Sequence, residues 1–286
     1  MSNFGAATSK VGPMPFGLGV ACGERIGWAN IEKFGHCDDV DTGSAPADVW
    51  GGADPDLPGT SIYTFSSTAV SYYISSADGS DTQDIVVVGL TEDGNGDWNE
   101  ETVTVTLAGQ TKTEIVSGSG DPWIRVYRAY NTGSTVFAGN VYVYEDDTVI
   151  AGVPQTDSLV RAVVVAGDDQ TEMCVYTVPN SVVINGVRET VDCAVFVGGY
   201  VGIARSSATA SVAEFTWRAR SPGSVFAVKG RIECQNRGSG YYSYLYPTGG
   251  ISVVPKTDVV MRCELVSANN TGVVGAYSIQ LKTTRG

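Results

Sequence analysis

Short apolar runs bounded by turn-forming residues recur along the chain, and this pattern constrains the fold more than any other feature. In residues 161–179, two such runs at 162–166 and 173–178 flank Gly167-Asp168-Asp169. Runs of this length that are rich in Val and Tyr are typical of β-strands joined by a tight connection. Nothing between the runs is long enough for a crossover helix, which disfavours a parallel α/β fold. The pattern therefore predicts an all-β chain.

The predicted strands fall into two groups, and 286 residues allow two domains. We expect an extended N-terminal arm over residues 1–42, an acidic β-sandwich domain over 43–160 and a jelly-roll-like β-sandwich domain over 161–286, both antiparallel. The first domain is predicted to contain strands at 61–65, 70–75, 84–90, 101–107, 124–130, 140–144 and 148–151. The second, after the two runs named above, is predicted to contain strands at 181–184, 192–201, 213–220, 225–235, 241–246, 251–253, 258–266 and 273–281.

The N-terminal arm is predicted to hold onto a partner. Gly and Pro recur through it, and the apolar side chains Met14, Phe16, Leu18 and Trp28 stand isolated between them. Such a segment cannot close a core of its own, yet leaving these anchors in water is unfavourable. We include Trp50, at the opening of the first domain, among the expected contact residues. A loose terminal tail is the alternative.

Charge is unevenly distributed along the chain. The formal net charge is −13, but residues 1–160 contain 6 Lys or Arg against 22 Asp or Glu, whereas residues 161–286 contain 12 against 9. An acidic surface repels phosphates, so we expect no direct nucleic-acid partner. The basic side chains of the second part fit an acidic protein surface, including that of another copy. A homo-oligomer is therefore expected.

The sequence gives no indication of a membrane or an export pathway. No run of about 18 apolar residues occurs, so we expect no membrane partner. The first residues lack a charged region followed by a continuous apolar stretch, which disfavours a secretory signal. Six widely spaced cysteines, none in a CxxC pattern, are then expected to be mostly buried thiols: Cys22, Cys37, Cys174, Cys193, Cys234 and Cys263.

None of the local motifs predicts a metal, a cofactor or a catalytic centre. His36 is the single histidine, and with its neighbour Cys37 it supplies at most two local ligands. The loop at 91–98 alternates Asp93, Asn95 and Asp97, but it lacks the full calcium-loop pattern, and its Asp-Gly and Asn-Gly pairs suit a hairpin turn. A glycosidase-type pair of carboxylates converges only in three dimensions, so the sequence leaves that alternative open.

An aromatic run at residues 241–246, YYSYLY, is predicted to be a strand that is half core and half subunit interface. Tyr242 and Tyr244 are its expected contact residues. Alternating tyrosines can also form a platform on which sugars or single-stranded DNA stack, so a glycan partner is the alternative.

Two sets of runs carry a resemblance to a known family. The first comprises DT at 41–42, DVWGG at 48–52, ETVTVTL at 101–107, WIRVYRAY at 123–130 and GNVYV at 139–143. The second comprises GDDQTEMCVYTVP at 167–179, PKTDVVMRC at 255–263 and SANNTGVVGAY at 267–277. Together they resemble virion structural proteins of tailed bacteriophages, mostly of marine phages, over residues 41–281. The chain departs from the family pattern at Ala47 and at Asn180-Ser181-Val182.

The resemblance implies a non-enzymatic, β-rich component of the particle that contacts other virion proteins, either the major capsid protein or tail proteins. It carries no catalytic residue over to this chain. A capsid decoration or cement protein is the function expected first. A tail adaptor, a fibre or a receptor-binding component that binds glycans is the alternative, and a glycan-degrading enzyme ranks last because no β-helical repeat is visible.

Overall fold

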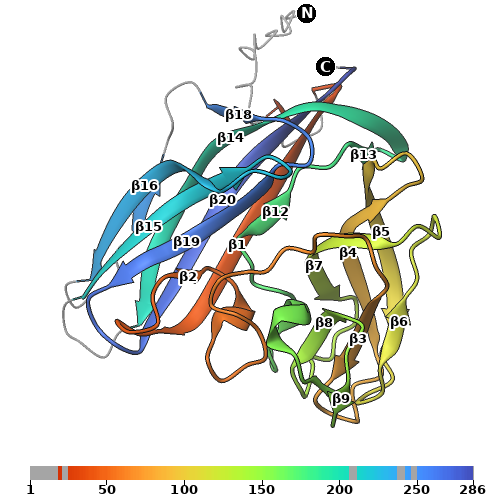
Figure 1. The fold of residues 1–286 in the computed structure, drawn as a ribbon, viewed down its shortest axis with the longest axis horizontal. Helices are drawn as coiled ribbons and strands as arrows, with labels where there is room; N and C mark the ends of the chain where they lie inside the picture. Colours follow the sequence, from red (N-terminus) through yellow and green to blue (C-terminus); the bar gives the residue numbers. More distant parts are fainter. Residues whose placement is uncertain (1–18, 21–24, 206–210, 237–241, 246–249, 286) are drawn as a thin grey trace, which may run out of the picture.

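The computed structural model describes residues 19–20, 25–205, 211–236, 242–245 and 250–285. The described residues are nearly all β, which confirms the predicted fold class. They form two sandwiches, one on the left and one at the lower right of Figure 1. Within the described part of the chain, no helix is long and apolar enough to span a membrane.

One sandwich is made from consecutive strands and is called here the inserted domain. Its first layer, in the order β5–β4–β7, is one end of a nine-stranded sheet that continues through β13 into the other sandwich, and its second sheet has the order β11–β8–β3–β6. Tyr72 in the second sheet donates a hydrogen bond to the Ile124 carbonyl in the first, at 3.2 Å. The strands are β3 (Tyr72–Ser76), β4 (Asp84–Glu92), β5 (Trp98–Thr106), β6 (Thr113–Ile115), β7 (Trp123–Asn131), β8 (Val141–Glu145) and β11 (Val160–Val164), with a small hairpin of β9 (Val149–Ile150) and β10 (Val153–Pro154).

The other sandwich, the outer domain, is built from both ends of the chain. One sheet contains β1 (Trp28–Val40), β20 (Thr271–Thr283), β14 (Val187–Arg205), β17 (Tyr242–Leu245), β18 (Ile251–Val253) and β13 (Ser181–Ile184). The facing sheet contains β12 (Val175–Thr177), β19 (Asp258–Val266), β15 (Ser211–Arg220), β16 (Ala227–Asn236) and β2 (Ala47–Asp48). Between the sheets, Phe196 stacks on Trp217 with ring centroids 4.0 Å apart.

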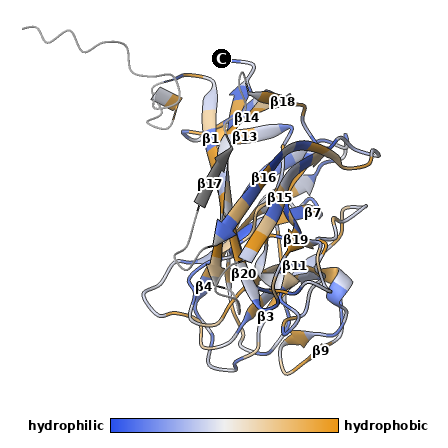
Figure 2. Ribbon diagram, turned by 90° about the vertical axis from the view of Figure 1, so that its left-hand side faces the viewer, coloured by the Kyte–Doolittle hydropathy of each residue, from blue (hydrophilic) through white to orange (hydrophobic). Residues whose placement is uncertain are grey.

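Apolar residues alternate with polar ones along many of these strands, and Figure 2 shows the resulting orange and blue bands. In β5, for example, Val103 and Val105 point inward while Thr102 and Thr104 are exposed, as the sequence predicts. The buried side chains of both sandwiches form one hydrophobic cluster. The two domains therefore share a core instead of packing as separate bodies.

Two expected boundaries differ from the structure. Residues 28–40, placed in the arm, form β1, which pairs with β20 at residues 28–37 and, after an irregularity, at Val40. Residues 160–164, placed at the start of the second domain, form β11, which pairs with β8 in the inserted domain. In β1 the buried residues Lys33, Gly35 and Cys37 alternate with the exposed Glu32 and Phe34, so the buried face does not look apolar in the sequence.

The inserted domain is joined to the outer domain by a buried ion pair. Arg125 on β7 makes two N–O contacts with Asp258 on β19, at 3.1 and 3.2 Å, and both side chains are almost fully buried. Thr177 on β12 donates to the same carboxylate at 2.7 Å, and Arg220 on β15 contacts it at 3.0 Å. The Arg125 guanidinium also lies over the Trp98 ring at 4.7 Å. Strands from both domains thus converge on one carboxylate.

Lys33 makes a second connection across the junction. It lies on β1 of the outer domain, is buried, and donates a hydrogen bond to the carbonyl of Tyr127 on β7. Burial is the main cause that lowers its pKa from 10.5 to about 7, and the charge of Arg128 lowers it further, while Cys174 opposes the shift. A buried amine of this kind is a costly group that the fold retains at the junction.

Candidate functional site

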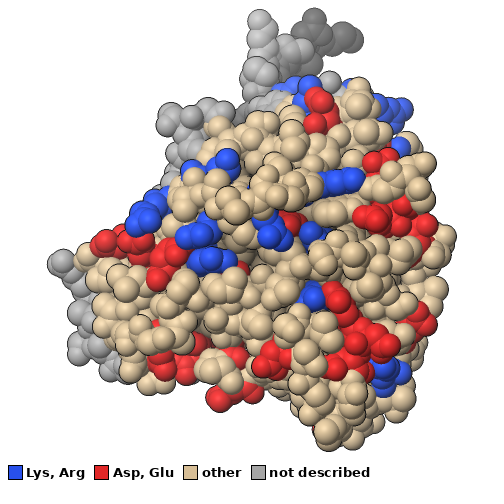
Figure 3. Space-filling model, viewed as in Figure 1, with Lys and Arg blue, Asp and Glu red and all other residues tan. Residues whose placement is uncertain are grey.

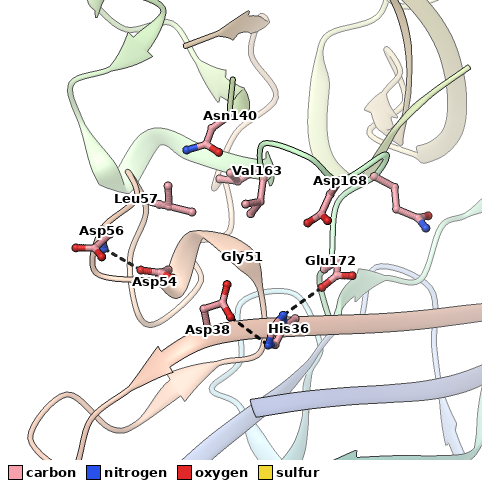
Figure 4. Close-up of a pocket in the computed structure, with 12 residues that line it drawn as sticks. His36, Asp38, Gly51, Asp54, Asp56, Leu57, Asn140, Val163, Asp168 and Glu172 are labelled. Atoms are coloured by element: carbon pink, nitrogen blue, oxygen red, sulfur yellow. Dashed lines mark hydrogen bonds and ion pairs between the residues drawn. The ribbon is translucent and has the colours of Figure 1, made fainter. Parts of the chain in front are cut away.

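An acidic pocket lies at the junction of the two domains (Figure 4). Its volume is about 150 Å³. Strand β1, the loop around residues 51–57, strand β11 and the connector that follows β11 all contribute to its wall. The lining residues are His36, Asp38, Gly51, Asp54, Asp56, Leu57, Asn140, Val163, Val165, Asp168, Gln170 and Glu172. Segments that are far apart in the sequence therefore build one concave surface.

His36 lies between two carboxylates at the base of this pocket. Its Nε2 atom is 3.5 Å from Asp38 Oδ1, and its Nδ1 atom is 3.5 Å from Glu172 Oε2. Asp38 is on β1 with His36, whereas Glu172 comes from the connector between the domains. These contacts link β1 to the connector between the domains.

The loop that carries Asp54 and Asp56 is held in place by Trp50. The Trp50 indole is fully buried, packs edge-on against Tyr63 at 5.0 Å and donates from Nε1 to the Thr60 carbonyl at 3.1 Å. Gly52 lies directly under the indole, where a Cβ atom would come within 2.4 Å of the ring. The 3₁₀ turn at Gly51–Ala53 follows, and Asp54 then accepts the Asp56 backbone N–H at 2.9 Å.

Negative charge dominates this pocket. The lining contains five carboxylates and one histidine, and no lysine or arginine. Burial, followed by the charge of Glu172, raises the pKa of Asp168, whereas His36 acts in the opposite direction. In the described part of the chain, no group of three or more His, Cys, Asp or Glu side chains is arranged to hold a metal ion. The site suits a cationic side chain brought by a partner, because such a group would relieve the repulsion among the carboxylates.

The charge pattern continues over the surface. In the view of Figure 3, Lys and Arg gather over β15, β16 and β19 of the outer domain, and Asp and Glu gather at the lower right over the inserted domain. Several of the basic side chains are paired within their own sheet. Arg218 contacts Glu264 at 2.6 Å, and Arg231 contacts Glu214 at 2.5 Å.

The contact residues expected from the sequence lie in different parts of the structure, and some of them lie outside the described residues. Met14, Phe16 and Leu18 lie outside the described residues. Trp28 is half-buried at the start of β1. Trp50 is a core residue and not a contact residue, because no part of it reaches the surface. Tyr242 and Tyr244 lie on β17, where the backbone register pairs them with Gly202 and Tyr200 of β14. Their contact with a partner stays a prediction.

Two other expectations can be compared with the structure. The loop at 91–98 is the β4–β5 hairpin turn, in which Asp93 accepts the backbone N–H groups of Asn95 and Asp97 at 2.8 and 2.9 Å. Cys37, Cys174, Cys193, Cys234 and Cys263 are free thiols, and all except Cys193 are buried. Cys22 lies outside the described residues.

Sequence reasoning does not identify the acidic pocket. Its acidic residues look like solvated turns in the sequence, because Asp54, Asp168 and Glu172 come from segments that are brought together only by the insertion of one domain into the other. The only available signal is the excess of acidic residues in the first 160 positions.

Comparisons with known proteins do not assign this chain to a family. No family model matches the chain, and no curated protein matches it. Among solved structures, the chain is similar to a tandem of two CBM22 domains from Paenibacillus barcinonensis Xyn10C, with 10% identity, 91% of this chain and 94% of that chain covered, and a TM-score of 0.20. It is also similar to a structure of the infectious bursal disease virus Gx strain (11% identity, 91% and 71% covered, TM-score 0.21) and to the VP2 subviral particle of that virus (9% identity, 91% and 77% covered, TM-score 0.19). Because these TM-scores are low, the similarities carry no argument about function.

Proposed function

We propose that this chain is a structural protein of a tailed-bacteriophage virion, associated with the capsid as a decoration or cement protein. The resemblance over residues 41–281 supports this proposal. The observation that carries it is the junction between the domains, where Arg125 and Asp258 form a buried ion pair inside a shared core. A component of a symmetric shell must hold its contact surfaces at fixed positions, and such a junction does this.

The acidic pocket is the proposed contact for a basic segment of a neighbouring virion protein. Its five carboxylates stand without a lysine or arginine in the lining. A partner's Lys or Arg side chain would supply the missing charge, which fixes register and speeds encounter more than it adds affinity. In this role the pocket binds a partner and performs no chemistry, and the protein is not an enzyme.

The proposal is tested by binding to particles. Virions from the source of this sequence are probed with an antibody against the purified chain, and the copy number is measured by quantitative mass spectrometry. Capsid decoration predicts hundreds of copies, on the order of the number of shell subunits, whereas a tail component predicts about a dozen. Absence of the chain from purified virions would refute the proposal. A copy number of about a dozen would indicate a tail component instead of a capsid component.

The pocket itself is tested with a charge-matched pair of variants. Asp54→Asn, Asp168→Asn and Glu172→Gln together remove three negative charges from the lining. The control carries Asp97→Asn, Glu114→Gln and Asp157→Asn, which remove the same charge from exposed positions elsewhere. Incorporation into particles should fall for the first variant and persist for the second. Equal incorporation of both variants would show that the acidic pocket is not part of the interface with a partner.

The predicted docking of the arm needs a deletion that leaves the fold intact. Because β1 begins at Trp28 and pairs with β20, removing residues 1–42 would destroy the outer domain. Removing residues 1–18 spares every described strand. We expect this shorter chain to fold normally and to be lost from particles, and undiminished incorporation would show that the arm is not needed.

A further inference from the structure

A second hollow lies on the outer face of the sheet β1–β20–β14, away from the acidic pocket. Its volume is about 220 Å³, and it is lined by Glu32, Val197, Gly198, Gly199, Tyr200, Ala276, Tyr277 and Ser278. These residues are brought together by the antiparallel register of the three long strands that run side by side in Figure 1. We call this hollow the sheet-face groove.

The register explains why this face is hollow. Phe34 pairs with Ala276, and Ala276 pairs with Tyr200, so one aromatic side chain flanks the small alanine on each side. In the adjacent row, Ser278 pairs with Gly198 beyond a bulge in β14. Gly199 has no room for a side chain, since a Cβ atom would lie 2.5 Å from the Ala276 carbonyl oxygen. The floor is therefore bare backbone, with Tyr200 in the lining and Phe34 at the other end of the same row, next to the lining residues.

The two aromatic side chains are accessible. Phe34 is 37% exposed and Tyr200 is 39% exposed, unlike the buried aromatic residues of the sandwich core. Exposed apolar side chains that form a contiguous patch often mark a binding site, whereas single exposed ones are common.

The opposite side of the groove is polar and ordered. The Ser278 hydroxyl donates to Glu32 Oε2 at 2.6 Å, and the Asn30 amide donates to Glu32 Oε1 at 2.5 Å. The carboxylate is therefore held in a fixed position while it stays exposed. It can accept further hydrogen bonds from a ligand's hydroxyl groups. A negative group here disfavours phosphates and other anions.

This combination suits one class of ligand. A pyranose ring presents C–H groups on its face and hydroxyl groups around its rim. The C–H face is attracted to the electron-rich face of an aromatic ring, and the hydroxyl groups donate to a fixed carboxylate. A floor of glycine backbone lets a flat ring approach closely. Few precisely placed polar groups beside aromatic ones are typical of small-molecule sites.

We infer that the sheet-face groove binds a neutral saccharide, with Tyr200 and Phe34 stacking on a sugar ring and Glu32 accepting its hydroxyl groups. This site is separate from the acidic pocket, and it does not depend on the proposed place of the protein in a virion.

The experiment uses the purified full-length chain. An array of neutral hexose and N-acetylhexosamine oligosaccharides identifies a binder, and titration calorimetry then measures its Kd. Tyr200→Ala and Phe34→Ala should each raise the Kd about threefold to tenfold. Tyr200→Phe should keep most of the affinity, because it retains the ring, and Glu32→Gln should weaken binding by removing the charged acceptor.

Tyr130→Ala is the matched control, because this tyrosine is half-buried on β7 in the inserted domain. It should leave the Kd unchanged. A thermal unfolding curve for each variant distinguishes a loss of binding from a loss of folding. Tyr200→Phe keeps the aromatic ring and therefore shows whether binding depends on the ring.

Three results would overturn the inference: no binding to any neutral saccharide at millimolar concentration, binding to anionic polysaccharides only, or an unchanged Kd in both Tyr200→Ala and Phe34→Ala. A dimer in light scattering that becomes monomeric in Tyr200→Ala would also overturn it, since a second copy would then cover the groove.

Discussion

Arg125 on β7 and Asp258 on β19 form a two-point ion pair, with N–O distances of 3.1 and 3.2 Å, that crosses from the inserted domain to the outer domain. The Asp258 carboxylate also accepts from Thr177 and contacts Arg220. Removing one partner of a buried pair leaves an uncompensated charge, and this is the usual reason for a large loss of stability. The two sides of the pair are not equivalent here.

We predict that Asp258→Asn destabilises the protein more than Arg125→Met does. Without the carboxylate charge, both guanidinium groups lose their anion, whereas in Arg125→Met the carboxylate keeps Arg220. We expect losses of about 3–5 kcal/mol for Asp258→Asn and about 3 kcal/mol or less for Arg125→Met, measured by urea unfolding. The exposed pair Lys112–Asp146 is the control, and Lys112→Ala should cost about 1 kcal/mol or less. The reverse order of the two buried variants would contradict the shared role of Asp258.

Lys33 gives the protein a pH dependence of predictable sign. Burial lowers its pKa from 10.5 in the unfolded chain to about 7 in the folded one. Between these values the unfolded state binds the proton and the folded state does not, so this group makes the fold more stable as the pH rises from about 7 towards 10.5. Below pH 7 both states are protonated, and the full penalty of the buried charge is present.

The measurement compares wild type with Lys33→Met by urea unfolding at pH 7, 8 and 9. Met keeps most of the volume but does not titrate. The stability of wild type relative to the variant should rise by at most about 1.4 kcal/mol per pH unit. Comparing the two chains cancels the titration of the thiols, which are common to both. Parallel pH profiles would show that Lys33 keeps its ordinary pKa.

The acidic pocket should lower stability in the absence of a partner. Burial and the charge of Glu172 raise the pKa of Asp168. This carboxyl therefore contributes stability that is lost as the pH rises from the ordinary pKa of an Asp side chain to the raised pKa in the folded protein. We predict that Asp168→Asn stabilises the isolated protein by a few tenths of a kcal/mol at pH 7, a small effect because the side chain is largely exposed to solvent. Thermal unfolding at low and high salt checks this, and the gain should shrink in high salt. Destabilisation by Asp168→Asn would contradict the repulsion.

The buried thiols should react slowly in the native state. Burial raises the pKa of both Cys37 and Cys263 to about 12, and it also raises the pKa of Cys174. At pH 8 a thiol with a pKa near 12 is a thiolate in only about one molecule in ten thousand, and the thiolate is the reactive form. Among the five described cysteines, Cys193, which is half-buried, should be alkylated first. Iodoacetamide labelling followed by peptide mass spectrometry measures the order, with labelling in urea as the control. Cys37 reacting as fast as Cys193 would refute the burial.

The strands themselves were largely predictable from the sequence, whereas their assembly was not. The prediction of a strand at 258–266 coincides with β19, because its apolar residues are interrupted only by Arg262 and Glu264 and the run is bounded by Thr257 and Ser267. Strand β1 was missed, since buried Lys33 and Gly35 interrupt its apolar pattern. The insertion of one domain into the other depends on pairings between positions more than 200 residues apart, such as Phe34 with Ala276, which no local pattern encodes.

The acidic pocket was unpredictable for the same reason. His36 and Glu172 carry no local signal for each other, and they meet only after β1 has joined β20 and the connector has left β11. Trp50 was misplaced for a different reason: an aromatic residue beside Gly51-Gly52 looks exposed in sequence, but the glycines let the chain fold closely around its ring.

The pairing of β1 with β20 also sets an order of events during synthesis. The inserted domain has all its strands once residue 164 has left the ribosome, so it can form early as a unit. The outer domain cannot close until β20, which ends at Thr283, has emerged, and until then β1 has no neighbour along its edge. A nascent chain that stalls before residue 271 would therefore display one folded sandwich and one long unpaired strand. An unpaired strand edge is prone to aggregation, so a chaperone would be needed most in this state.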